Sequence, residues 1–256
     1  MPKPWIATLD GGELALANSL RIRPLGQVYG CSVQMVSAQY QPMVTGEIAI
    51  EVEVFHEMLQ RSLDHLRQEA LSLGANGVIG IRIDWKQVDY TIAVSPPNYG
   101  SSMMVTGLAV FDELAPKGVL YLAAATIDEV FALRKADYVP AGFAVGASSY
   151  YQIAWRQVPT MTGGIFSVWA NEEITELTQG PYAAREIAMG RMSQAALAAG
   201  GTGIVGVKVT AEVYPAGTLQ LGTMAATCRF LCIGTAIRRN LGPTEQVSLA
   251  VALNIS

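Results

Sequence analysis

Few side chains in this 256-residue chain could bind a metal ion or act as a general base. The two histidines, His56 and His65, lie nine positions apart in a stretch with helical periodicity. Nine residues correspond to about 180° around a helix, so the two imidazoles cannot share a metal ion within one subunit. We expect both to be solvated helix positions, with His65 one turn before Glu69.

The cysteines offer no better metal site. Cys228 and Cys232 are four positions apart in a stretch that reads as a strand. Their side chains would face the same way about 13 Å apart, which is too far for one metal ion. We expect them to be small buried core residues. With Cys31 they make an odd number without framework spacing, which is typical of a reducing compartment and predicts a cytoplasmic protein.

Acidic residues form two groups. Glu47, Glu51 and Glu53 alternate with aliphatic residues in GEIAIEVEV, which predicts an extended segment with one acidic face. The corresponding region later in the chain contains Glu172, Glu173 and Glu176. Such faces are either solvated or, if subunits repeat around a ring, able to bind a cation. We favour the solvated face.

Glycines follow a predicted helix at Gly74, Gly77 and Gly80. A nucleotide-binding loop needs the strand first and the helix second, so that helix amides point at the phosphate. Here the order is reversed, and the glycines indicate a helix end followed by close strand packing. No serine or cysteine lies in a pattern with a base and an orienting partner. We therefore assign no catalytic, cofactor-binding or metal-binding residue, and expect no enzyme and no cofactor.

The composition limits the partners. The net charge is −4 and only 17 Lys and Arg are scattered along the chain, which excludes a basic surface for nucleic acid or for an anionic membrane. Charged residues make up 15% and hydrophobic residues 51%. This profile fits either a membrane protein or a protein whose surface is buried between subunits.

The membrane alternative fails on run length. A spanning helix needs about 20 apolar residues, and the best stretch, residues 224–237, is interrupted by Arg229. Asp10 and Glu13 also fall where the apolar core of a signal peptide would continue. We expect a homo-oligomer without membrane insertion.

An internal repeat organises the chain. Residues 5–33 align without a gap on 121–149, and residues 55–83 align on 181–209. Both copies contain a capping signal, Asp-x-x-Glu or Thr-x-x-Glu, before a short helix. GANGVIGIRI matches GGTGIVGVKV, and MVTGLAVF matches LCIGTAIR. These blocks predict two tandem, diverged domains, residues 1–116 and 117–256, with a ten-residue insertion between about 150 and 180.

Each copy is expected to be α+β, with an antiparallel sheet and helices on one face. A helical stripe predicts the helix face that packs on the first sheet: Phe55, Met58, Leu59, Ser62, Leu63, Leu66, Ala70 and Leu73. The second long helix is predicted to open at Pro181 and to pack closer through small residues: Ala183, Ala184, Ala188, Met192, Ala195 and Ala196.

The runs LRQEALSLGANGVIGIRI and AREIAMGRMSQAALAAGGTGIVGVKV resemble the YbjQ-type family, whose usual label is "putative heavy-metal-binding". The resemblance covers the second part of each copy well and the first part loosely. It implies small α+β domains that assemble into rings, commonly pentamers, without an established catalytic activity. The chain is then a non-catalytic assembly module whose ring or shell presents a surface to a partner. The alternative is a binding protein with metal-ion or small-ligand sites between subunits.

The tail, residues 246–256, alternates strictly. Its apolar face consists of Val247, Leu249, Val251, Leu253 and Ile255. This pattern predicts a strand that extends the second domain and would be an aggregation hazard if left unpaired. It pairs either with the sheet of a neighbouring subunit or within its own domain.

Overall fold

The computed structural model describes residues 9–36, 44–90, 98–115, 118–154, 175–219 and 223–240. The first half contains α1 (Gly11–Ser19), β1 (Ile22–Val36), β2 (Gly46–Glu47), α2 (Ala49–Ser72), β3 (Gly77–Tyr90) and β4 (Asn98–Asp112). The second half contains β5 (Tyr121–Leu122), α3 (Ile127–Lys135), β6 (Tyr138–Ala154), α4 (Thr175–Ala198), β7 (Gly203–Leu219) and β8 (Thr223–Arg239). The predicted α+β class is confirmed.

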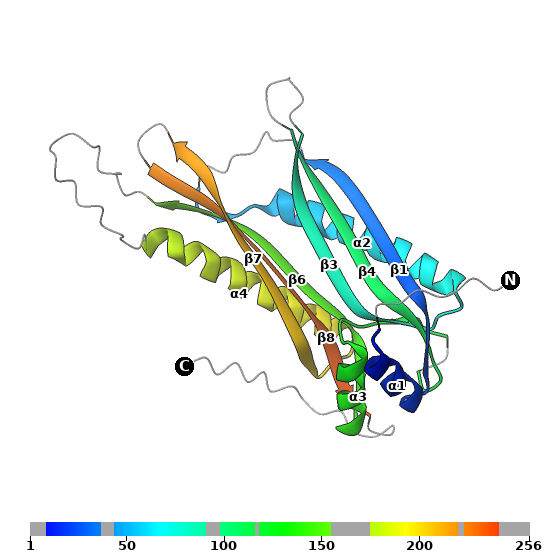
Figure 1. Cartoon of the computed structure of the whole chain (residues 1–256). Helices are drawn as coiled ribbons and strands as arrows, with labels where there is room; N and C mark the ends of the chain where they lie inside the picture. The colour runs from blue at the N-terminus through cyan, green and yellow to red at the C-terminus, as the bar shows by residue number, and fades with distance from the viewer. Residues whose placement is uncertain are drawn as a thin grey trace.

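The strands form two four-stranded sheets, in the orders β1-β4-β3-β5 and β2-β6-β8-β7. The three long strands of each sheet are antiparallel. Helix α2 packs on β1 and β4, and α4 packs on β6 and β8. Figure 1 shows the two sheets side by side, with α1 and α3 together at one end. We call the sheet face that carries the long helix the inner face and the opposite one the outer face.

The two halves repeat local detail as well as the order of their helices and long strands. The capping boxes predicted before α1 and α3 are both formed. Two residues after the end of each short helix lies a non-glycine residue with positive φ, 56° at Arg21 and 59° at Asp137. Each first long strand then has an irregularity after a proline, Pro24 or Pro140. In each of these pairs, the residue of the second half lies 116 positions after its equivalent in the first. The division at residues 116 and 117 lies outside the described residues and stays a prediction.

Glycine lets the long helices lie directly on the sheets. A Cβ on Gly30 would lie 1.8 Å from the Ser62 carbonyl oxygen, and one on Gly146 would lie 1.9 Å from that of Ala188. The predicted helical stripe is buried from Phe55 to Ala70. Leu73 lies just beyond the helix and is exposed. The small-residue face of α4 is confirmed by the burial of four members: Ala184, Ala188, Met192 and Ala196.

Two boundary predictions were wrong. The stretch read as extended in GEIAIEVEV is largely helical, because α2 begins at Ala49 and buries Val52 in the same stripe as Phe55. Helix α4 begins at Thr175, so Pro181 lies inside it. The buried Gly180 packs against Cys228 and Gln152 at this turn, which holds the helix on the sheet despite the hydrogen bond that proline removes.

The glycines after the helices are structural for two reasons. Gly77 faces Tyr121 so closely that a Cβ would lie 2.4 Å from the ring, as the close-packing prediction requires. Gly80 and Gly206 have φ of +64° and +62° instead, a conformation that other residues rarely adopt. The prediction of close packing was therefore wrong for Gly80, where a Cβ would meet nothing within 4 Å, whereas one on Gly206 would lie 3.2 Å from Glu129 Oε1.

Two further expectations concern the core. Cys228 and Cys232 are buried beneath α4, as predicted, and burial raises the pKa of the Cys232 thiol to about 11. The apolar stretch interrupted by Arg229 lies in β8. No helix in the described part of the chain is both long and apolar enough to cross a membrane.

Candidate functional site

The most elaborate set of contacts lies between the two halves, where each gives a short strand to the sheet of the other. Strand β2 of the first half pairs with β6, and the Ile48 amide donates to the Ser149 carbonyl at 2.8 Å. Strand β5 of the second half pairs with β3, and the Ala123 amide donates to the Val78 carbonyl at 2.9 Å. Backbone hydrogen bonds therefore join the halves in both directions.

An apolar core covers the outer face of the second sheet. Ala147, Leu231 and Ile233 point away from α4 and are buried in the same cluster as Ile81 of β3 and Phe55 of α2. This cluster is the main core of the first half. The second half therefore completes the core of the first, and its own outer face is removed from water in the process.

A polar trio lies beside this core. Glu51, in the first turn of α2, accepts from Ser149 Oγ at 2.8 Å and from Arg229 Nη2 at 2.9 Å. The Arg229 guanidinium also lies 5.0 Å from the Trp85 ring and 5.4 Å from the Tyr214 ring. Its side chain is only 9% exposed. A buried guanidinium that lost its carboxylate would be costly, so the trio fixes how the halves meet.

A second ion pair lies at the exchanged strand β2. The Arg191 guanidinium donates to both Glu47 oxygens, at 2.5 and 2.8 Å, and to the Ala147 carbonyl at 2.9 Å. Glu47 and Glu51 thus bind arginines of the second half, whereas Glu53 is exposed. The solvated acidic face expected from the sequence is not formed by these two residues, because Glu47 in β2 binds Arg191 and Glu51 in the first turn of α2 binds Arg229. Glu176 is exposed, and Glu172 and Glu173 lie outside the described residues.

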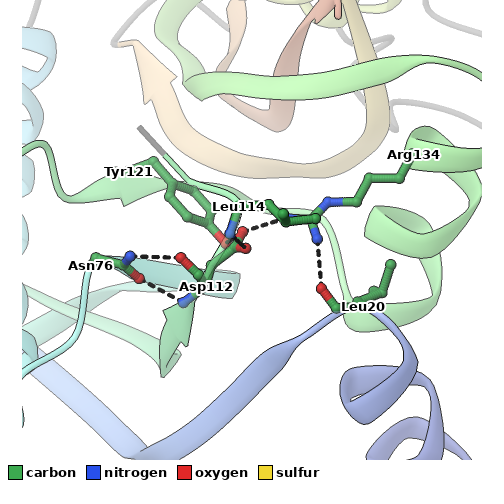
Figure 2. Close-up of polar contacts among 6 residues, drawn as sticks. All are labelled: Leu20, Asn76, Asp112, Leu114, Tyr121 and Arg134. Carbon is green, nitrogen blue, oxygen red and sulfur yellow. Dashed lines mark hydrogen bonds and ion pairs between the residues drawn. The ribbon is translucent and has the colours of Figure 1, made fainter. Parts of the chain in front are cut away.

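A third cluster surrounds Asp112 at the end of β4 (Figure 2). This carboxylate is 2% exposed and forms an ion pair with Arg134 of α3. It accepts from Tyr121 Oη at 3.1 Å, and its backbone exchanges hydrogen bonds of 2.7 and 2.8 Å with the Asn76 side chain. Arg134 also donates to the Leu20 carbonyl at 2.9 Å. Figure 2 shows Tyr121 and Arg134 of the second half beside the Asp112 carboxylate, with Asn76 at its backbone.

The Asp112 cluster is structural. Burial first, and then the charge of Asp112, raises the pKa of Tyr121, so the phenol stays protonated and donates at any physiological pH. The two carboxylate oxygens are engaged by Leu114 N, Tyr121 and Arg134. A carboxylate so fully bonded holds the halves together rather than activating a substrate.

The histidines lie apart. His56 is exposed on α2, and partial burial followed by the charge of Arg191 lowers its pKa. His65 Nδ1 lies 3.1 Å from the Cys31 carbonyl oxygen, whereas Glu69 accepts from the Tyr29 amide at 2.6 Å. His65 and Glu69 therefore contact different backbone groups of β1, although they lie one helical turn apart. In the ranges that the structure describes, no three His, Cys, Asp or Glu gather into a metal-binding group.

A small cleft opens between β3 and the second sheet. Its volume is about 120 Å³ and its lining is mixed: Ile83, Asp84, Trp85, Lys86, Thr210, Glu212, Arg229 and Leu231. Small-molecule pockets are typically about 300 to 1,000 Å³. This cleft has room for a few water molecules, and Arg229 at its wall is already bound to Glu51.

Known proteins match the chain in two ways: a family matches part of the first half, and one protein matches nearly the full length. Residues 25–113 match the YbjQ-type family, described as "Putative heavy-metal-binding". The first half therefore resembles that family in the region that the sequence indicated. Across 98% of its length the chain is 26% identical to a Mycobacterium tuberculosis protein named encapsulin nanocompartment protein, and the alignment covers 92% of that protein. No solved structure matches the chain significantly.

Sequence reasoning missed the ties between the halves. Arg229 was noticed only as an interruption of an apolar stretch, although a charge in such a strand is typically buried with a partner. Arg191 and Glu47 are 144 residues apart, and no local pattern links them. Aligning the repeats gives equivalent positions within each half but not the contacts between them.

Proposed function

We propose that this protein is a non-catalytic structural subunit that assembles with copies of itself into a closed ring or shell and presents a surface to a partner. The observation that carries the proposal is the similarity to the M. tuberculosis encapsulin nanocompartment protein, because it extends over 98% of this chain and 92% of that one. Both halves are therefore included in the similarity.

The distribution of apolar residues supports assembly. Several large hydrophobic side chains on the two sheets are 41–61% exposed in the single chain: Tyr29, Val33, Met104, Val207, Val209 and Val213. Gathered apolar surface of this kind marks sites of protein association.

Binding of a metal ion or small ligand between subunits is the competing function. Within one chain, the described residues do not gather into a group of metal ligands, and the cleft beside Arg229 is only about 120 Å³. A site of this kind would need groups from two copies. The family description is the observation that favours it.

Native mass spectrometry combined with elemental analysis tests the proposal. We expect one defined multimer without stoichiometric metal, and we expect five chains in it because pentameric rings are common in the YbjQ-type family. Dialysis against a chelator should leave the multimer unaltered. A monomer at micromolar concentration would overturn the proposal. Stoichiometric metal whose removal disperses the multimer would favour the binding function. The tail, residues 246–256, lies outside the described residues, and its pairing stays a prediction.

A further inference from the structure

We infer that a second copy of this chain docks head to tail: the outer face of its first sheet packs on the β7 side of the second half, repeating the contact between the two halves of one chain. This inference rests on the proposed assembly function and specifies its surfaces. Within the chain, the outer face of the second sheet meets the β3 side of the first half. In the described part of the chain, the equivalents of both surfaces contain exposed apolar side chains.

The first uncovered surface is the outer face of the first sheet. Tyr29, Val33 and Met104 are 49, 61 and 45% exposed there, and Cys31 is exposed beside them. The repeat offsets of 116 for β1 and 127 for β4 relate these positions to the second sheet. Their equivalents are partly or fully buried against the first half: Val145, Ser149, Leu231 and Ala147.

The second uncovered surface is on β7, along the side that faces the same way as α4. Val207 and Val209 are 41 and 51% exposed. At an offset of 126 their equivalents are Ile81, which is fully buried, and Ile83, which is half-buried against the second half. In the first half, the β3 side is covered and the outer face of the sheet is exposed. In the second half, the outer face is covered and the β7 side is exposed.

The residues at the centre of the contact change together. Within the chain, Glu51 meets Ser149 and Arg229. The equivalents at the bare surfaces are three other residues: Leu177 in the first turns of α4, Val33 on β1 and Ser102 on β4. A half-buried carboxylate with its two donors is therefore replaced by an aliphatic pair and a small hydroxyl. Loss of the acid alone would leave a buried arginine unpaired, whereas the concerted change leaves two surfaces that match.

Positions outside the repeated contact behave differently. Leu71 on α2 is 59% exposed, and its equivalent Leu197 on α4 is 54% exposed. Exposure therefore does not alternate between the halves everywhere. This pair lies on the long helices, outside the contact between the halves.

The contact uses two different surfaces, so it is heterologous, and successive copies generate a ring if the rotation closes. We test it with Val33→Asp, which blocks the outer face of the first sheet, and Val209→Asp, which blocks the β7 side. Leu71→Asp is the matched control, since it places the same charge at a similarly exposed aliphatic position. Circular dichroism and thermal unfolding check that each variant folds like the parent, and light scattering gives its mass.

We expect each blocked variant to lose at least ten-fold in apparent assembly affinity, while Leu71→Asp assembles like the parent. A 1:1 mixture of the two blocked variants retains one intact pair of surfaces and should form heterodimers that grow no further. Folded variants that both assemble like the parent would overturn the inference and leave the assembly function standing. Self-dimers of one blocked variant would also overturn it, because they require a face-to-face contact. A monomeric parent would remove the proposed function itself.

Discussion

The outer faces of the two sheets have the same strand layout but differ in what covers them. On the second sheet, Leu231 and Ser149 are 7 and 0% exposed beneath the first half, whereas the equivalent Met104 and Val33 of the first sheet are 45 and 61% exposed. Beneath the long helices, on β1 and β4 and on β6 and β8, the inner faces are covered alike, because each carries its own helix. The halves therefore differ on their outer faces and along the inner sides of β3 and β7, where Ile81 is buried and Val207 is 41% exposed.

The inner faces should respond alike to the most disruptive substitution. Val in place of Gly30 or Gly146 would force side-chain atoms into the carbonyl of Ser62 or Ala188, because even the Cβ has no room. We expect either variant to unfold or to be recovered only as aggregate, which circular dichroism and solubility would measure. Gly190→Val on α4 is the control, since a Cβ there meets nothing within 4 Å. A soluble, native-like Gly146→Val protein would contradict the described helix–sheet contact.

The covered junction should be more sensitive than the bare end. Arg134→Ala leaves the buried Asp112 without its cation, at a cost of about 3 to 5 kcal/mol in the free energy of unfolding. The equivalent residue of α1 is Asn18, which is exposed, so Asn18→Ala should change stability by less than about 0.5 kcal/mol. Urea unfolding of both variants measures the difference. Equal losses would mean that the ion pair does not stabilise the junction.

The features that the two halves share could be predicted from the sequence, whereas the contacts between the halves could not. Capping boxes, helix-ending glycines and the buried stripe of α2 depend on residues a few positions apart, and these were predicted. The start of α2 was misread because GEIAIEVEV fits a strand as well as a helix, and burial of Val52 decides between them. The ion pairs of Arg191 with Glu47 and of Arg229 with Glu51 join residues far apart in the sequence, so no local pattern could predict them.

Transplanting the trio would sharpen the comparison between the in-chain contact and its proposed repeat. Leu177→Glu alone should weaken assembly about ten-fold or more, because it buries a carboxylate against aliphatic Val33. Adding Val33→Ser and Ser102→Arg supplies the donors that Ser149 and Arg229 provide within the chain. We expect the triple variant to regain at least part of the lost affinity in sedimentation experiments. A triple variant weaker than Leu177→Glu would argue against equivalent surfaces.

The smallest effect concerns thiol labelling. Cys31 is exposed in the single chain, whereas Cys228 and Cys232 are buried. The residue equivalent to Cys31 in the second half is Ala147, which is fully buried where the two halves meet. Cys31 should therefore react with maleimide several-fold more slowly in the assembled parent than in the dispersed Val209→Asp variant, as mass spectrometry would quantify. Equal rates would place Cys31 outside the contact.

Cross-linking between chains tests the central claim most directly. Ser149 and Glu51 are joined by a hydrogen bond of 2.8 Å, so their equivalents, Val33 and Leu177, should meet where two copies dock. One chain would contain Val33→Cys and the other Leu177→Cys, both with Cys31→Ser, and a short bismaleimide would be added after the two are co-assembled. The account predicts a covalent dimer only when both chains are present, and none when Leu71→Cys replaces Val33→Cys. Co-assembled chains that give no dimer at positions 33 and 177 would contradict it.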